Sequence, residues 1–183
     1  MEKIAVIDTE TNWIDQVMSI GCCIADADGF RLLDARYYVL TPEYEIGGMY
    51  ENTLFCDPKL QPVPRSREDV LTELQEWFSQ WGIQKIFAYN ASFDRNHLPE
   101  LRYLAWYDIM RLAAYRQFNP AIPECADCYR TGRLKRGYGV EPMLRLLSLD
   151  RSYYETHNAM HDAIDELTIM RLLGHDLSTY IPL

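Results

Sequence analysis

The stretch Lys3-Ile4-Ala5-Val6-Ile7-Asp8-Thr9-Glu10 decides the fold, because four consecutive apolar residues lead directly into two carboxylates. A short apolar run of this kind is typical of a buried central strand. Side chains two apart on a strand point to the same side, so we expect Asp8 and Glu10 to face one site. Burying that pair is costly without a cation or hydrogen-bond donors. The same pattern also occurs at solvated strand ends, so the rest of the chain must decide between the two interpretations.

Local signals divide the rest of the chain into strands and helices. Strands over 17–25 and 31–40 flank a turn-forming cluster and predict an antiparallel hairpin. Ser66 and Asp69 form a weak capping box before apolar residues at helical spacing, and Gly82 ends that helix. The further elements expected are a strand over 85–89, a helix over 94–104, a further strand or a strand-to-helix corner over 107–112, a helix over 140–147, and a last helix that Thr156 or Asn158 caps and Gly174 stops.

The order of these elements predicts an α/β protein with a single domain over residues 1–183. Strands come first and then alternate with helices, which is typical of a mixed sheet covered by helices. The 183 residues are enough to bury a substantial core. Two segments lack periodicity: 41–64, rich in Pro, Gly and Glu, is expected to be an extended surface connection, and 116–139 is expected to be irregular.

Two further segments carry carboxylates in positions where they can join Asp8 and Glu10. Asn90-Ala91-Ser92-Phe93-Asp94 follows a short apolar strand and opens a helix, where the helix dipole alone also favours an Asp. In His157-Asn158-Ala159-Met160-His161-Asp162, five residues of helix amount to a rotation of about 140°, so His157 and Asp162 would not share a face of one helix. We expect them to converge if His157 lies in the loop and Asp162 in the first turns.

In this order, the three segments resemble the motifs of the DEDD-type 3′-to-5′ exonucleases. The motifs are Asp-x-Glu, Asn-x-x-Phe-Asp and His-x-Ala-x-x-Asp. The His places the resemblance in the DEDDh or DnaQ-like branch, which includes the epsilon proofreading subunit, ribonuclease T and oligoribonuclease. It spans residues 4–173 and includes 107–112, a segment similar to one that follows the second motif in the family. The implied fold is ribonuclease H-like, a mixed sheet flanked by helices.

The resemblance also implies a mechanism and its residues. Asp8, Glu10, Asp94 and Asp162 would hold two divalent cations, and their oxygen ligands suit Mg²⁺ or Mn²⁺. Together with His157 as general base, they would hydrolyse a single-stranded 3′ end to nucleoside 5′-monophosphates by two-metal-ion catalysis. No residue here identifies a partner for a 2′-hydroxyl, so DNA and RNA both remain open. The residues expected to bind the end of the strand are Thr9, Trp13, Asn90 and Phe93.

Two features depart from a simple match to the family. Many relatives continue the first motif with Thr and Gly, whereas this chain has Thr11-Asn12-Trp13. Trp13 is expected either to stack on the terminal base or to form an aromatic lid over the core. The net charge of −9 argues against a protein that coats phosphates, although carboxylates that hold metal ions can still act on nucleic acid.

One cationic cluster stands out against this acidic background. It comprises Arg130, Arg133, Lys135 and Arg136, and Tyr129 and Tyr138 lie beside it in sequence. A flexible basic loop with aromatic residues can guide a single strand toward the site. The alternative is an ordinary solvated loop.

The remaining expectations concern the cell compartment, partners and cysteines. Five cysteines and an acidic N-terminus without signal-peptide character favour the reducing cytoplasm, and no apolar run is long enough for a membrane span. Cys125 and Cys128 have the spacing of half a zinc knuckle, but two thiols are the simpler interpretation. Glu166, one helical turn after Asp162, could add negative charge near the site but is expected to be solvated. The alternative to an active nuclease is a catalytically silent module that binds nucleic acid or a polymerase, and a polymerase or a second copy of the chain is considered as a partner.

Overall fold

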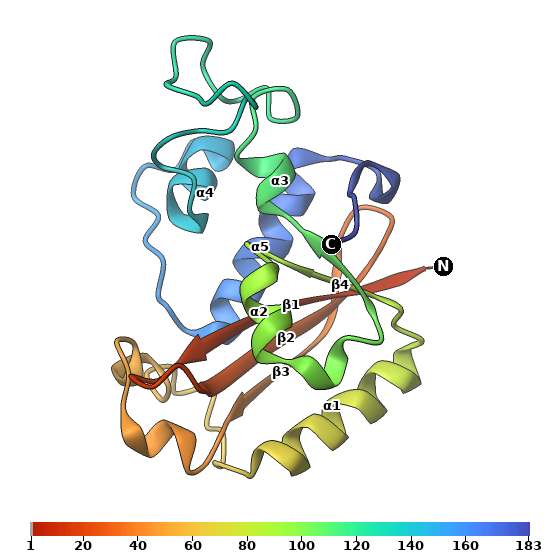
Figure 1. Cartoon of the computed structure of the whole chain (residues 1–183), viewed down its shortest axis with the longest axis vertical. Coiled ribbons are helices and arrows are strands. Elements are labelled where there is room, and N and C mark those ends of the chain that lie inside the picture. Colours follow the sequence, from red (N-terminus) through yellow and green to blue (C-terminus); the bar gives the residue numbers. More distant parts are fainter. Residues whose placement is uncertain (1) are drawn as a thin grey trace.

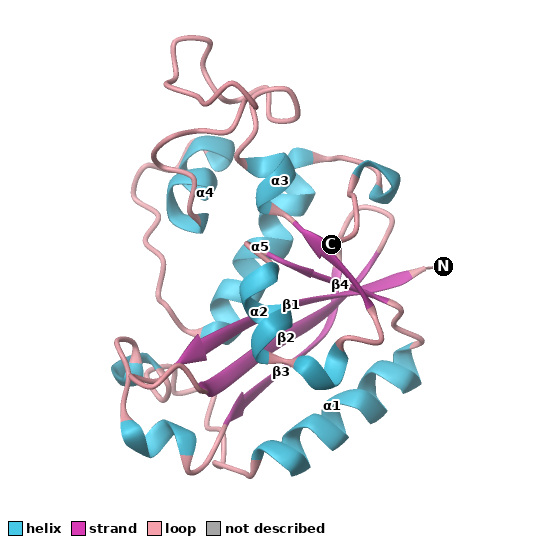
Figure 2. Ribbon diagram, viewed as in Figure 1, coloured by secondary structure: helices cyan, strands magenta, loops and turns pink. Residues whose placement is uncertain are grey.

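A mixed five-stranded sheet lies at the centre of the computed structural model, which describes residues 2–183 (Figures 1 and 2). Its strands are β1 (Lys3–Thr11), β2 (Val17–Asp26), β3 (Leu32–Val39), β4 (Lys85–Ala88) and β5 (Ala105–Asp108). The helices are α1 (Arg67–Trp81), α2 (Ser92–His97), α3 (Met110–Ala113), α4 (Val140–Ser148) and α5 (Ala159–Leu173). Short 3₁₀ turns occupy Glu43–Ile46, Glu51–Thr53, Pro99–Leu101 and Leu177–Thr179.

The strand order is β3-β2-β1-β4-β5, which places β1 in the middle of the sheet. The first three strands pair antiparallel, and β4 and β5 add in parallel to β1. The predicted hairpin, the central apolar strand and the mixed α/β sheet are therefore confirmed. The α/β arrangement matches the ribonuclease H-like architecture that the motifs implied.

Helices cover both faces of the sheet, and β1 contributes alternate side chains to each face (Figure 1). Ala5 and Ile7 belong to a buried cluster with α1, whereas Ile4 and Val6 belong to a second cluster with α3, α4 and α5. The period of two along a strand therefore directs even-numbered residues of β1 toward α5. This alternation determines which face of the sheet carries the candidate site.

Helix ends follow the local capping signals. Ser66 caps α1 by accepting a hydrogen bond from the Asp69 backbone, and Gly82 ends the helix in a left-handed conformation. Asn158, rather than Thr156, caps α5 through a hydrogen bond from the Met160 backbone, and Gly174 again ends the helix in the left-handed region. Local signals thus give the limits of both long helices correctly.

Two expected segments differ from the structure. The helix expected over 94–104 is shorter, because α2 ends at His97 and a separate 3₁₀ turn begins at Pro99. Proline disfavours helical backbone at the preceding residue, and Leu98 accordingly has φ −121° and ψ 62°. The connection expected over 41–64 is not simply extended: it forms two 3₁₀ turns and buries Leu54. Segment 116–139 contains no helix or strand within the described chain, as predicted.

None of the helices in residues 2–183 is long and apolar enough to cross a membrane.

Candidate catalytic site

The site begins on β1, where Asp8 and Glu10 continue the row of Ile4 and Val6 toward α5. Asp8 is partly buried, and its buried Oδ2 atom has no hydrogen-bond partner. Burial and the neighbouring charges raise the pKa of Asp8 well above its usual value, with Glu166 the largest of those charges. Both carboxylates therefore lie in surroundings that disfavour their ionised forms unless a cation is present.

The second carboxylate segment follows β4. Asn90 has a left-handed backbone (φ 61°), and its N–H donates to Asp108 Oδ1 at 3.0 Å. This sharp turn brings Asp94, in the first turn of α2, back to β1. The Thr9 hydroxyl there donates to Asp94 Oδ1 at 2.8 Å. Thr9 thus positions a carboxylate with its side chain, while its backbone belongs to the pairing of β1 with β2.

The third segment confirms the predicted convergence of His157 and Asp162. His157 lies in the loop before α5 with φ 52°, and Asp162 lies in the first turn of α5. Side-chain ligand atoms of Glu10, His157 and Asp162 lie within 4.8 Å of one another. Because His157 lies in the loop and not in the helix, its side chain can approach Asp162, although the two residues would lie on different faces of one continuous helix.

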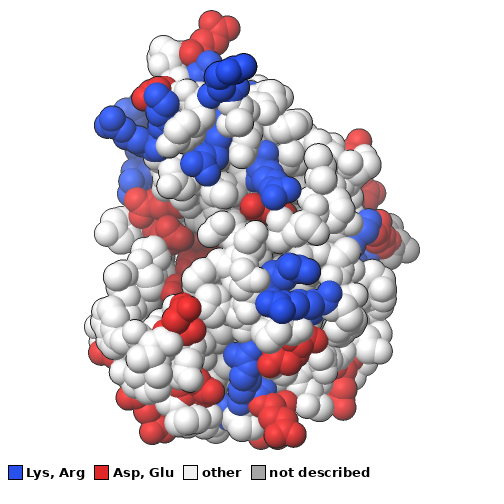
Figure 3. All heavy atoms as spheres, viewed as in Figure 1, with Lys and Arg blue, Asp and Glu red and all other residues white. Residues whose placement is uncertain are grey.

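The carboxylates of this cluster lie close together, and their pKa values are raised as a result of burial and of one another's charge. Burial is the main cause that raises the pKa of Glu10 to about 8, of Asp94 to about 7 and of Asp162 to about 9. Neighbouring carboxylates add to the rise at Glu10 and Asp162. Buried oxygens of Asp8, Asp162 and Glu166 lack partners. Figure 3 shows acidic side chains inside a recess on one face of the molecule. Such a set of oxygen donors fits a divalent cation.

Two carboxylates of the site are absent from the predicted set of site residues. Glu166 was expected to be solvated, and this prediction is wrong: the residue is only 1% exposed. It lies one helical turn after Asp162, and residues four apart share a helix face, so it points into the same acidic cluster. Glu155 is partly buried and raises the pKa of Glu10 and Asp162. The spacing of four residues was the available signal for Glu166, whereas Glu155 carried none.

A glycine allows α5 to approach the sheet. Gly21 in β2 pairs with Asp8 of β1, and a Cβ atom built on it would lie 2.0 Å from the Ala159 carbonyl oxygen. Real Cβ atoms essentially never come this close to another heavy atom. The first turn of α5 therefore reaches the carboxylates only because position 21 has no side chain.

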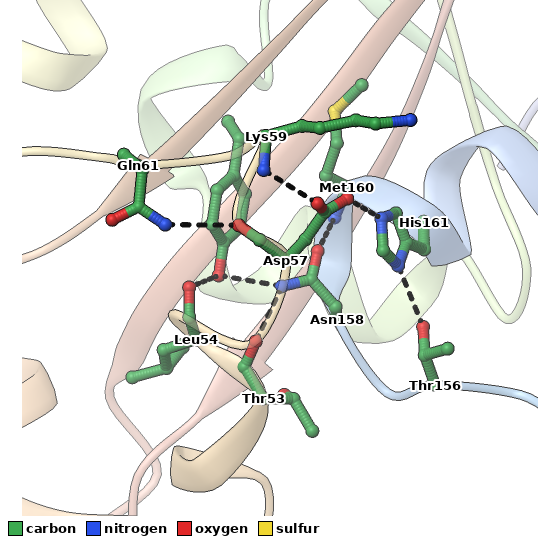
Figure 4. Close-up of polar contacts among 10 residues, drawn as sticks. Thr53, Leu54, Asp57, Lys59, Gln61, Thr156, Asn158, Met160 and His161 are labelled. Carbon is green, nitrogen blue, oxygen red and sulfur yellow. Dashed lines mark hydrogen bonds and ion pairs between the residues drawn. The ribbon is translucent and has the colours of Figure 1, made fainter.

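The 3₁₀ turn over Glu51–Thr53 and the residue before it form a second wall of the site, which the sequence did not predict. The Tyr50 and His157 rings stack with centroids 4.1 Å apart and planes 18° from parallel. The Thr53 hydroxyl donates to the His157 carbonyl oxygen, and Asn158 Nδ2 donates to the Thr53 carbonyl oxygen at 2.8 Å. Figure 4 shows the Asn158 side chain hydrogen-bonded to Thr53 on one side and to the Met160 backbone on the other. The stack with Tyr50 thus holds the ring of His157, and the hydrogen bond from Thr53 holds the backbone of the same residue.

A neighbouring set of polar contacts ties the same wall to α5 (Figure 4). His161 Nε2 lies 3.0 Å from Asp57 Oδ2, and His161 Nδ1 lies 3.1 Å from the Thr156 hydroxyl oxygen. Both ring nitrogens of His161 therefore contact other side chains of the protein, and the ring points away from the carboxylates around Asp162.

The residues expected to bind nucleic acid fall into two groups. Trp13 is 65% exposed and lines a cavity of about 310 Å³ together with Glu10, Met49 and Tyr50, so it is not a lid over the core. Phe93 is partly exposed beside the site, where its ring contacts the ring of His97. The second group lies apart from the cavity in segment 116–139 and consists of Arg130, Arg133, Lys135 and Arg136.

The cysteine pair has no metal-site geometry. Among residues 2–183, the one group of three or more potential metal ligands is Glu10, His157 and Asp162. Cys125 is exposed, and Cys128 Sγ instead accepts a hydrogen bond from Arg116 at 3.2 Å. Cys125 and Cys128 are therefore two free thiols.

Comparison with known proteins identifies neighbours by structure and not by sequence. No protein-family model matches the chain, and no curated protein sequence matches it. The nuclease domain of 3′hExo, a DEDDh family member bound to rAMP, superposes with a TM-score of 0.68 at 13% identity, covering 99% of this chain and 96% of that one. Exonuclease X in complex with 5′ overhanging duplex DNA superposes with a TM-score of 0.59 at 22% identity, covering 92% of this chain and 90% of that one.

Escherichia coli Exonuclease I in complex with a dT13 oligonucleotide gives a TM-score of 0.64 at 13% identity, and covers 98% of this chain but 42% of the larger neighbour. The chain therefore has the α/β fold of the DEDDh 3′-exonuclease domains. At these identities the likeness establishes the fold alone, and the chemistry must be argued from the site.

Proposed function

We propose that this protein is a metal-dependent 3′-to-5′ exonuclease of the DEDDh family that hydrolyses single-stranded nucleic acid ends to nucleoside 5′-monophosphates. One observation carries the proposal: acidic side chains from β1, α2 and α5 crowd into one recess beside an imidazole, and three of their buried oxygens lack partners. A structural role does not account for this arrangement, because unneutralised buried carboxylates destabilise a fold.

The donor set fits divalent cations. Asp8, Glu10, Asp94 and Asp162 would hold two ions, and their exclusively oxygen character favours Mg²⁺ or Mn²⁺ over Zn²⁺. When bound, the ions would activate water and stabilise the charge that develops on the phosphate and the leaving oxygen. Thr9 orients Asp94 through its hydroxyl, which leaves the other oxygen of that carboxylate available.

His157 is the proton acceptor of the proposal. A general base must lie within reach of the attacking water, and the imidazole lies beside Glu10 and Asp162. Histidine is the side chain that most often serves as a general acid or base in enzymes, which suits that role. Stacking on Tyr50 and the hydrogen bond from Thr53 to the His157 carbonyl limit the orientations of the ring. Preorganisation of this kind lowers the cost of reaching the reactive geometry.

The cavity beside Glu10 suits the terminal nucleotide. Its volume of about 310 Å³ is in the range of small-ligand sites, and the exposed faces of Trp13 and Met49 offer an apolar surface to a base. Base stacking on an aromatic side chain typically contributes about 1–3 kcal/mol per base. The neighbours named above hold a ribonucleotide in one case and DNA in others, so both sugars are natural candidates.

Product analysis tests the proposal and separates it from the silent binding module. Purified protein is incubated with single-stranded DNA or RNA in Mg²⁺, Mn²⁺ or EDTA, and the products are resolved by chromatography. The proposal predicts nucleoside 5′-monophosphates with either metal and none in EDTA, and the ratio of rates identifies the preferred sugar. Tight binding of the strands with no mononucleotide released under any condition would favour the silent module.

A further inference from the structure

Segment 115–139, which we call the basic arm, is a projecting loop that the acidic site does not explain. It joins α3 to α4 and forms one end of the molecule in Figure 1. Lys and Arg side chains gather over that end in Figure 3, and the acidic recess opens on the same face. A local concentration of cations is unexpected in a chain with a net charge of −9.

The basic arm is tied to itself by hydrogen bonds although it has no regular secondary structure. The Tyr129 N–H donates to the Arg133 carbonyl at 2.8 Å, and the Arg116 N–H donates to the Gly132 carbonyl at 3.0 Å. The Leu134 N–H donates to the Ala114 carbonyl at 2.9 Å, and the Leu134 side chain is buried. The loop was expected to be flexible, but these hydrogen bonds hold its backbone in place. Its side chains therefore project from a fixed backbone.

The four cations of the cluster Arg130, Arg133, Lys135 and Arg136 differ in what they contact. The Arg133 guanidinium lies between two aromatic rings, 5.1 Å from the centroid of Tyr129 and 5.3 Å from that of Tyr138. Lys135 is paired with Asp127 at 2.8 Å. Arg130 and Arg136 are exposed, and neither forms an ion pair within residues 2–183. Two cations thus organise the arm, and two are free to meet an anion.

The arm adjoins the acidic site through Tyr89. The Tyr89 hydroxyl donates to the carbonyl oxygen of Tyr138, and the Tyr89 backbone lies close to the buried carboxylate of Glu166. Tyr89 also directly precedes Asn90, where the second carboxylate segment begins. Tyr89 therefore connects the base of the arm with the acidic site, so a strand that leaves the recess on this side runs toward the arm.

From these contacts we infer that the basic arm binds the phosphate backbone of the single strand upstream of the nucleotide in the acidic site. Arg130 and Arg136 contact the phosphates, and the exposed faces of Tyr129 and Tyr138 support the bases between them. The inference rests on the proposed function for the direction in which the strand runs. It assigns the arm to substrate affinity and leaves the hydrolysis of the terminal linkage to the recess.

The test compares a long single strand with a substrate too small to reach the arm. Binding of a fluorescent oligonucleotide is followed by anisotropy in EDTA at several salt concentrations, for the wild type and for the double variant Arg130→Gln with Arg136→Gln. A control variant, Lys3→Gln with Arg31→Gln, removes the same charge from the start of β1 and from the turn between β2 and β3. Hydrolysis of a nucleoside 5′-monophosphate p-nitrophenyl ester reports on the recess alone.

The arm variant should bind the strand about tenfold or more weakly at low salt, and its salt slope should fall by about 1.4, since each phosphate contact to a single strand contributes about 0.7. Ester hydrolysis should stay within about twofold of the wild type, because the recess is untouched. Unchanged affinity and slope, or an equal loss in the control variant, would overturn the inference and leave the arm to an acidic protein partner. If the wild type binds strands through the arm but does not hydrolyse the ester, the proposed function fails and the arm assignment stands.

Discussion

Replacing Gly21 with Ala perturbs the contact that holds α5 against the sheet. The new Cβ atom would lie 2.0 Å from the Ala159 carbonyl oxygen and 2.3 Å from the Met160 nitrogen, whereas ordinary contact begins at 3.4 Å. The backbone atoms must therefore separate by about 1.4 Å. All the atoms concerned are backbone or directly attached to it, so no side-chain rotation relieves the clash. The start of α5 must move, and His157 and Asp162 move with it.

The expected effects follow from that displacement. Overpacking of a well-filled interior typically costs about 1–3 kcal/mol of stability. A shift of about 1 Å in catalytic geometry can lower the rate by about 100-fold. The free energy of unfolding is measured by denaturant titration, and nuclease activity is measured on a single strand with Mn²⁺ at a temperature where circular dichroism shows the variant folded.

The matched control is Gly139→Ala. A Cβ atom at position 139 would meet nothing closer than Pro142 at 3.9 Å, and the backbone there (φ −75°) suits any residue. This control should keep its activity and stability. A folded Gly21→Ala protein that degraded single strands at the wild-type rate would refute the claim that close approach of α5 builds the site.

Three further predictions test individual parts of the site. His157→Ala should lower turnover by about 10²–10⁴-fold with Mn²⁺ binding retained in calorimetry, and lost binding would instead make the imidazole a ligand. Tyr50→Ala should lower kcat by releasing the stacked ring while Tyr50→Phe retains it, so equal losses in both would contradict a stacking role. Burial raises the pKa of Glu10 to about 8 and of Asp162 to about 9, so the folded metal-free protein holds protons that the unfolded chain releases near pH 4. Its Tm should fall as the pH rises from about 5 to 9, and the increase in Tm on adding Mn²⁺ should grow over the same range; a pH-independent Tm would contradict this.

Local signals in the sequence predicted much of the fold. Ser66 and Gly82 gave the ends of α1, and Asn158 and Gly174 gave those of α5, because capping depends on only a few neighbouring residues. The strand-to-carboxylate pattern at Asp8 located the central strand for a similar reason. Pro99 was the missed local signal, since a helix rarely continues through such a residue.

The parts of the site that the sequence did not give depend on contacts between distant segments. Tyr50 meets His157 across more than 100 residues, and no periodicity or spacing encodes that stack. The burial of Glu166 contradicts the usual solvation of Glu and follows only from the position of α5 against β1. The joint effect of the carboxylates on one another likewise requires the folded arrangement.

The most direct test of the central claim is degradation of oligonucleotides labelled at the 5′ or the 3′ end. The protein is incubated with each strand in Mg²⁺, Mn²⁺ or EDTA beside Asp8→Asn, which keeps the shape of the side chain but removes its charge. We predict that 5′-labelled strands shorten stepwise from the 3′ end, that 3′ labels are released as mononucleotides, and that EDTA or the variant abolishes both. Shortening from the 5′ end, or wild-type activity in Asp8→Asn, would contradict it.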